Sequence, residues 1–202
     1  KGLPNLLQHV DNVKNVYGLP CVVAINAFPT DTKAELDLVE SKCRELGVNV
    51  RLSEVWAKGG EGGLALAEEV IRLCGEPNHF QFVYDVNDSI EDKLNAIATK
   101  VYHADGVVIA ASAKKQLKQL TELGFDKLPI CMAKTQFSFS DDASKLGAPR
   151  GFKITVRDLK VNAGAGFLVA KTGDIMTMPG LPKVPSAEKI DVDENGKIMG
   201  LF

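Results

Sequence analysis

The sequence contains few residues of the kinds from which metal centres, disulfide frameworks and phosphate-binding loops are built. Its three histidines, His9, His79 and His103, lie far apart and show no ligand-like spacing. The four cysteines include no C-x-x-C pair, and the P-loop pattern G-x-x-x-x-G-K-[ST] is absent. We therefore expect no metal site, and no nucleoside triphosphate held by a P-loop of this chain itself.

Long apolar runs and a strong excess of charge of one sign are also missing. No apolar run approaches the roughly 20 residues of a membrane span, and no signal peptide is visible. The net charge is −2 without a basic tract, which argues against a general nucleic-acid binder. Each cysteine falls in an apolar strand or helix pattern, so we expect buried free thiols in a reducing, cytoplasmic compartment.

The first part of the chain has the rhythm of a parallel α/β sheet, in which helices alternate with short strands. Hydrophobic spacing predicts helices over residues 3–16, 33–46 and 64–74, and strands over 21–25 and 48–55. Thr32, with Glu35 three residues later, is a capping box for the second of these helices.

The cluster Gly75-Glu76-Pro77-Asn78 is the best candidate for a domain boundary, and it divides the chain into residues 1–76 and 77–202. Beyond it we expect strands over 80–85, 106–110 and 128–133, and helices over 88–101 and 112–123. Asp88 and Glu91 are the expected caps of the first of these helices. In the final third, Asn195-Gly196 between apolar flanks predicts a closing β-hairpin.

Two aromatic rings are expected just beyond the carboxyl ends of the first two strands. Phe28 follows the first strand, and Trp56, the one tryptophan, follows the second. Ligands of parallel α/β sheets bind beyond these strand ends, so the two rings would suit a flat heterocycle whose edge Asn26 could hydrogen-bond. The alternative is that both rings pack into the core or under the second domain, and the residues alone slightly favour it.

Glycine-rich turns offer a second kind of site. Residues 58–63, KGGEGG, precede a predicted helix and could bring backbone amides to an anion, and so could NAGAGF at 162–167. Neither is a phosphate-binding fingerprint, and glycine-rich turns are commoner than anion sites. The stretch IDVDENG matches the first half of an EF-hand loop, but Phe202 stands where the loop needs glutamate, so we expect a hairpin without calcium.

Several longer stretches carry a family resemblance: VVAINAFPTDT, VWAKGGEGG, LPICMAKTQFSFS, NAGAGFLVAKTGDIMTMPGLPK and IDVDENGKIMGLF. Together they resemble the carboxyl-terminal part of formate–tetrahydrofolate ligase, or 10-formyltetrahydrofolate synthetase, in its bacterial form. The likeness runs from about residue 3 to residue 202. It implies that residues 1–76 end a large P-loop-type, nucleotide- and folate-binding domain with a parallel α/β sheet. Residues 77–202 would then form a smaller mixed α/β domain that ends in a β-hairpin.

The resemblance also implies an activity. Enzymes of this family phosphorylate formate with ATP to formyl phosphate, and N10 of tetrahydrofolate then attacks the formyl carbon; Mg²⁺ accompanies ATP and a monovalent cation assists. The family's P-loop belongs to a part that this sequence lacks, and the chain starts at Lys1 on a helical pattern. We therefore expect a piece of a longer enzyme, inactive alone, whose partner is the amino-terminal P-loop portion. The family also implies a homo-oligomer, usually a tetramer.

Site residues follow from the same resemblance, position by position. The pterin would stack between Phe28 and Trp56, with Leu52 on the same pocket wall. Further members of the folate motif are Asn26, Pro29, Asp31 and Thr32. The residues expected near the nucleotide are Lys134, Thr135, Pro149 and Arg150. The role of the ring pair would be to position the substrate, and we assign no general base.

Two other interpretations stay open at this stage. The chain could mainly hold subunits together, through the short β segments and the MTMPGLP stretch of its last third. Without the resemblance, it could be an unrelated α/β module that binds generic planar ligands.

Overall fold

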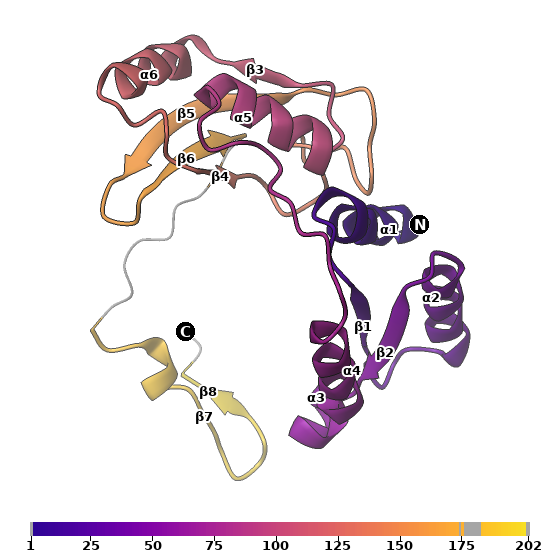
Figure 1. Ribbon diagram of the computed structural model, residues 1–202. Coiled ribbons are helices and arrows are strands. Elements are labelled where there is room, and N and C mark those ends of the chain that lie inside the picture. The colour runs from indigo at the N-terminus through magenta and orange to yellow at the C-terminus, as the bar shows by residue number, and fades with distance from the viewer. Residues whose placement is uncertain (1, 174, 176–182, 201–202) are drawn as a thin grey trace.

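The computed structural model describes residues 2–173, 175 and 183–200, and it folds into a mixed α/β structure with parallel and antiparallel strand pairs (Figure 1). The helices are α1 Leu3–Asp11, α2 Lys33–Glu45, α3 Val55–Lys58, α4 Leu64–Cys74, α5 Ile90–Ala96 and α6 Ala111–Glu122. The strands are β1 Val22–Asn26, β2 Asn49–Ser53, β3 Val107–Ile109, β4 Ile130–Ala133, β5 Ile154–Asn162, β6 Phe167–Thr172, β7 Asp191–Val192 and β8 Ile198–Met199.

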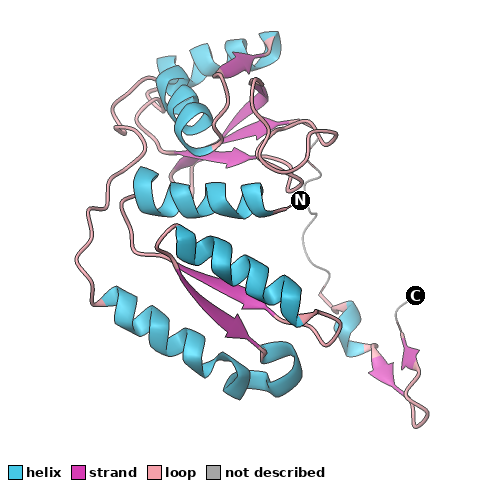
Figure 2. Ribbon diagram, turned by 90° about the vertical axis from the view of Figure 1, so that its right-hand side faces the viewer, coloured by secondary structure: helices cyan, strands magenta, loops and turns pink. Residues whose placement is uncertain are grey.

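The first sheet consists of β1 and β2, which run parallel with Asn26 opposite Ser53. Figure 2 shows a helix on each side of this strand pair. Because side chains alternate along a strand, Val48 and Val50 are buried against α1 and α2. Their neighbour Asn49 faces α4, where its side-chain amide donates to the buried carboxylate of Glu69 at 2.6 Å. Apolar packing covers one face of the sheet, and polar contacts hold the helix on the other.

Helix α2 begins at the capping box that the sequence predicts. The Thr32 hydroxyl accepts the Glu35 backbone N–H at 3.3 Å, and the Glu35 carboxylate accepts the Thr32 backbone N–H at 3.0 Å. Two N–H groups that the first helical turn leaves unpaired thereby gain acceptors. The Thr32 hydroxyl also donates to the Glu35 carboxylate at 2.6 Å, and this bond, together with the one from the Thr32 backbone N–H, lowers the pKa of the Glu35 carboxyl group.

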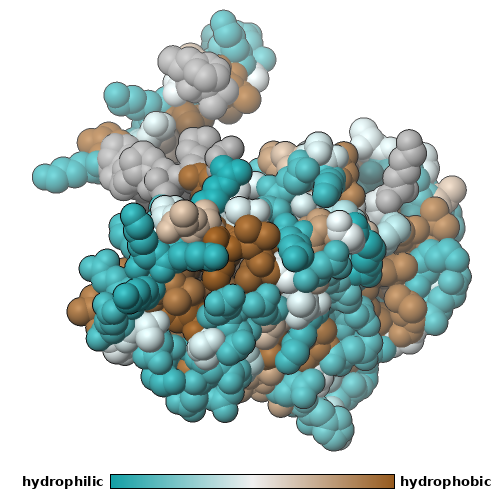
Figure 3. Space-filling view, turned by 90° about the horizontal axis from the view of Figure 1, so that it is seen from above, coloured by the Kyte–Doolittle hydropathy of each residue, from teal (hydrophilic) through white to brown (hydrophobic). Residues whose placement is uncertain are grey.

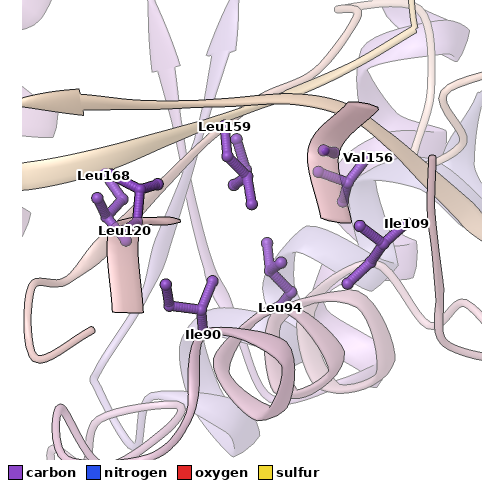
Figure 4. Close-up of a cluster of buried hydrophobic side chains, with 9 residues drawn as sticks. Ile90, Leu94, Ile109, Leu120, Val156, Leu159 and Leu168 are labelled. Carbon is purple, nitrogen blue, oxygen red and sulfur yellow. The ribbon is translucent and has the colours of Figure 1, made fainter. Parts of the chain in front are cut away.

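The second sheet has four strands in the order β3-β5-β6-β4, with β5 and β6 antiparallel and both outer pairs parallel. Helices α5 and α6 pack on it over the main hydrophobic core. In Figure 4, Ile90 and Leu94 of α5 point toward Leu159 and Leu168 of the sheet. Leu94 and Leu168 are fully buried, and burial of a side chain of this size contributes about 1.5–3 kcal/mol.

Helix α1 lies between the two sheets (Figure 1 and Figure 2). Its Val10 packs into the core of the parallel sheet. On its other side the Asn5 amide donates to the carbonyl of Gly147 at 2.9 Å, and just past its end the Asn12 amide donates to that of Val101 at 2.8 Å. The first helix therefore contacts both halves of the chain.

The expected strand over residues 80–85 is wrong, because these residues form a loop. Backbone donors of this segment bond to another loop instead of a sheet neighbour: the His79 N–H donates to the Gly18 carbonyl at 2.9 Å, and the Gln81 N–H to the Tyr17 carbonyl at 3.1 Å. In this loop Val83 is buried, whereas Phe80 and Phe82 are exposed.

Two smaller expectations also need correction. The N-cap of α5 is Ser89, whose hydroxyl accepts the Asp92 N–H at 3.1 Å, and not Asp88. The prediction of buried thiols holds for Cys43 but is wrong for Cys74 and Cys131, which are exposed. Cys131 lies on β4 between Ile130 and Met132, which pack on the main core, so its own side chain points to the opposite face of the sheet.

The last described residues form a short antiparallel ladder of β7 and β8. The Asp193 carboxylate accepts the backbone N–H groups of Asn195 and Lys197, both at 2.9 Å, which closes the turn between the strands. The stretch MTMPGLP, residues 176–182, lies outside the described residues.

Hydrophilic residues cover much of the face seen in Figure 3, with apolar patches between them. Over the described part of the chain, no helix is both long enough and apolar enough to cross a membrane.

Candidate functional site

Two aromatic rings meet at the carboxyl edge of the parallel sheet. Since β1 and β2 run in the same direction, the segments that follow them leave the sheet at the same edge. The loop after β1 carries Phe28, and the short helix α3 after β2 carries Trp56. Their ring centroids are 5.9 Å apart and the ring planes are tilted by 55°. The two rings are therefore in contact with each other, in a tilted arrangement.

Both rings are open to solvent. Phe28 is 43% exposed and Trp56 is 65% exposed, while Leu52, near the end of β2, is 40% exposed. Packing into the protein core therefore does not account for their position. Large apolar side chains that gather in the open are typical of a binding surface.

The loop that carries Phe28 is held by its own hydrogen bonds. The Phe28 backbone N–H donates to the Asp31 carboxylate at 2.8 Å, and the Asp31 N–H donates back to the Phe28 carbonyl at 2.9 Å. Next to this turn, the Ala27 N–H donates to the Ser53 carbonyl of β2 at 2.9 Å. Asp31 thus closes the turn, and Thr32 caps the helix that follows.

Two other residues of the predicted folate motif lie exposed at the same edge. Asn26 is the last residue of β1, and Pro29 follows Phe28 in the loop. Within the described part of the chain, the Asn26 amide has no hydrogen-bond partner, so both its donor and its acceptor can serve a ligand.

Trp56 is supported by a feature that the sequence analysis did not connect with it. Helix α3 follows Glu54, whose backbone N–H donates to the Gly62 carbonyl at 3.0 Å. The Lys58 ammonium also pairs with the Glu54 carboxylate at 2.7 Å. The run KGGEGG was interpreted as a possible anion site, but here the 3₁₀ turn Gly59–Gly63 folds back onto the start of α3. The only sign of this backbone contact in the sequence was the high density of glycines in the run.

The residues predicted to face the nucleotide lie in the other half of the chain, on loops of the four-stranded sheet. The Lys134 ammonium follows β4 and donates to the carbonyls of Thr135 at 2.6 Å, of Ser140 at 2.8 Å and of Ser138. Burial lowers the pKa of Lys134. Its side chain therefore organises its own loop in this structure. Arg150 is exposed beside the half-buried Pro149.

Chemically, the ring pair is suited to bind and orient a flat heterocycle. Aromatic stacking contributes roughly 0.5–1.5 kcal/mol per ring pair beyond burial. We assign no acid–base role to the carboxylates of this loop and cap, because Asp31 is engaged by the Phe28 N–H and Glu35 by Thr32. Among the described residues, no group of three or more histidine, cysteine, aspartate or glutamate side chains is arranged to hold a metal ion.

The comparison with known families agrees with the resemblance that the sequence carries. The family model described as formate–tetrahydrofolate ligase matches residues 1–202, which is the whole chain. Enzymes of this family are ligases of one-carbon metabolism that use ATP and tetrahydrofolate. This chain therefore belongs to the formate–tetrahydrofolate ligase family.

Proposed function

We propose that this chain is the folate-binding, carboxyl-terminal portion of a formate–tetrahydrofolate ligase, in which Phe28 and Trp56 hold the pterin ring of tetrahydrofolate. The observation that carries the proposal is the pair of exposed rings, 5.9 Å apart, at the carboxyl edge of a parallel sheet. Membership of the family supplies the ligand. Leu52 would form an apolar wall of the pocket, and the Asn26 amide would bond the edge of the pterin.

The bound pterin needs more room than the ring pair leaves at present. A flat ligand between two parallel rings requires them about 7 Å apart, which is twice the 3.5–4 Å contact distance between carbon atoms. The centroids lie closer than this and the planes are tilted. We therefore expect one ring to turn outward when the ligand enters, and Trp56, on a four-residue helix, is the less constrained of the two.

The role of the pair in the reaction is positioning. In the ligase reaction the N10 lone pair attacks the formyl carbon of formyl phosphate. The bond between the formyl carbon and the oxygen that bridges to phosphorus then breaks, and phosphate leaves with the electron pair while N10 loses a proton. Holding N10 against the formyl carbon converts an encounter between two molecules into a step within one complex. No residue of this chain is assigned to carry the proton.

The ATP-dependent half of the reaction requires groups that this sequence does not contain. Because the P-loop pattern is absent, we propose that an amino-terminal portion of the same enzyme binds ATP and that this chain alone does not turn over. Among the described residues, no carboxylate cluster fits Mg²⁺, and the positioning role of the ring pair needs neither Mg²⁺ nor a monovalent cation. Contact of Lys134, Thr135, Pro149 and Arg150 with the nucleotide stays a prediction.

The proposal is tested by anaerobic titration of the chain with tetrahydrofolate, followed through the fluorescence of Trp56 and corrected for inner-filter absorption. We expect saturable quenching in the wild type. In Phe28→Ala the dissociation constant should rise about two- to tenfold or more, because stacking is lost. Phe82→Ala is the matched control, since it removes a ring that is 80% exposed in the other half of the chain. It should titrate like the wild type. Absence of saturable quenching in a chain shown to be folded by circular dichroism would overturn the proposal.

A second candidate function is subunit association. Phe80 and Phe82 are 49% and 80% exposed and pack edge to face, with their centroids 5.1 Å apart. Exposed aromatic pairs of this kind are typical of protein interfaces. A sedimentation coefficient that rises with concentration, and that falls to the monomer value in Phe82→Ala, would support this function. A monomer at high concentration would contradict it.

A further inference from the structure

We propose that Gly62 is a positioning residue that sets the place of Trp56 in the folate site. The inference rests on the proposed function in one respect, namely that Trp56 contacts the folate. It assigns a role to the glycine-rich stretch KGGEGG that neither anion binding nor the family resemblance supplies.

Trp56 needs a support of this kind because the protein core does not hold it. Helix α3 has four residues and none of them is buried. Trp56 itself is 65% exposed, and among the described residues the aromatic ring in contact with it is Phe28, which lies on another loop. The position of the indole ring therefore depends on what fixes the ends of this short helix.

The support comes from the 3₁₀ turn that follows α3. The Gly62 carbonyl accepts the backbone N–H of Glu54, the residue before the helix, at 3.0 Å. The approach is so close that a Cβ atom on Gly62 would lie 2.5 Å from both the carbonyl carbon and the oxygen of Glu54. Real Cβ atoms do not come so near to backbone atoms, and a rigid backbone has no flexible end that could move aside. A side chain at position 62 would therefore push the start of α3 away.

Neighbouring contacts fit the same arrangement but are less demanding. A Cβ on Gly63 would lie 3.1 Å from the Cγ2 atom of Val55, which a small shift can relieve. Gly59 has φ +59° and ψ −147°, a conformation almost confined to glycine, and it reverses the chain between α3 and the turn. The exposed ion pair between Lys58 and Glu54 contributes little, as is usual for surface pairs. The backbone contact at Gly62 is thus the specific one.

The test compares Gly62→Ala with Gly60→Ala. Both changes add one methyl group to the same turn, and neither glycine has a positive φ. A Cβ on Gly60 would meet nothing within 4 Å, so this variant controls for the chemistry of the change. Emission and anisotropy of Trp56 report the place of the ring without ligand, and far-UV circular dichroism with thermal unfolding reports the fold.

For Gly62→Ala we expect an altered Trp56 emission, a thermal midpoint close to that of the wild type, and tetrahydrofolate binding about fivefold weaker or worse. Gly60→Ala should match the wild type in every measurement. An unchanged emission in Gly62→Ala overturns the inference, and so does wild-type affinity where the emission has shifted. If the wild type itself does not bind tetrahydrofolate, the proposed function fails, whereas the emission of the two ligand-free variants still decides whether Gly62 places Trp56.

Discussion

Replacement of Asp31 by alanine is expected to weaken tetrahydrofolate binding although its carboxylate is engaged with the protein backbone. The carboxylate accepts the Phe28 N–H at 2.8 Å and closes the turn that presents the phenyl ring. Without it, the turn keeps only the backbone bond from the Asp31 N–H to the Phe28 carbonyl. The Phe28 ring then samples more positions, and the ligand must restore the order when it binds.

The expected size follows from that single hydrogen bond. A hydrogen bond to a charged group contributes about 1.5–3 kcal/mol, and solvent exposure brings this one toward the ordinary range of about 0.5–1.5 kcal/mol. If the whole of this free energy must be supplied by ligand binding in Asp31→Ala, the dissociation constant rises about two- to tenfold. The fold itself should stay intact, because α2 keeps its separate cap at Thr32.

The assay is the fluorescence titration at Trp56, carried out with Asp31→Ala, Asp31→Asn and the wild type. Asparagine keeps an acceptor oxygen at the same place but carries no charge. If Asp31 acts by closing the turn, Asp31→Asn should bind within about twofold of the wild type, and Asp31→Ala should bind more weakly.

Two results would refute this reasoning. Wild-type affinity in Asp31→Ala would mean that the turn does not limit the position of Phe28. Equal losses in Asp31→Asn and Asp31→Ala would mean that the negative charge itself acts on the ligand. The turn would then be incidental to the function of Asp31.

Leu94→Ala should destabilise the chain by about 2–5 kcal/mol, because this fully buried leucine leaves a cavity, whereas the exposed Leu123→Ala should stay within about 0.5 kcal/mol in urea unfolding. Equal midpoints for the two variants would contradict the core assignment. Hydrogen bonding from Arg72, with the charge of Arg51, lowers the pKa of Glu69 in the folded state. The Glu69 carboxylate therefore contributes fully to folding stability above its unfolded pKa of about 4.3, and this contribution is lost as the pH falls through the lower pKa of the folded state. The stability difference between the wild type and Glu69→Gln should shrink between about pH 7 and about pH 3, and a constant difference would show that the carboxylate is not what matters.

Local patterns predicted local structure well. The Thr32–Glu35 capping box lies within one helical turn, so the sequence contains all of its partners, and the structure confirms it. The alternation of strands and helices in the first 75 residues is confirmed in the same way, because hydrophobic periodicity is read along the chain.

Predictions that depended on distant partners were less successful. Residues 80–85 have the composition of a strand, but the backbone acceptors that they meet belong to Tyr17 and Gly18 in a loop. Cys131 has apolar neighbours in sequence, yet it is exposed because it alternates with Ile130 and Met132, which pack on the core face of the sheet. No local pattern indicates which face of a strand the helices will cover.

The ring pair separates what the sequence determined from what the tertiary structure decided. The sequence by itself determined that Phe28 and Trp56 each follow a strand, since strand patterns and loop residues are local. It also carried the family membership, which long motifs specify. Only the tertiary structure decided that the two rings touch, that both stay open to solvent, and that Gly62 lies against Glu54. The meeting of the two rings depends on the parallel register that sets Asn26 beside Ser53, and strand register arises from the packing of the whole sheet.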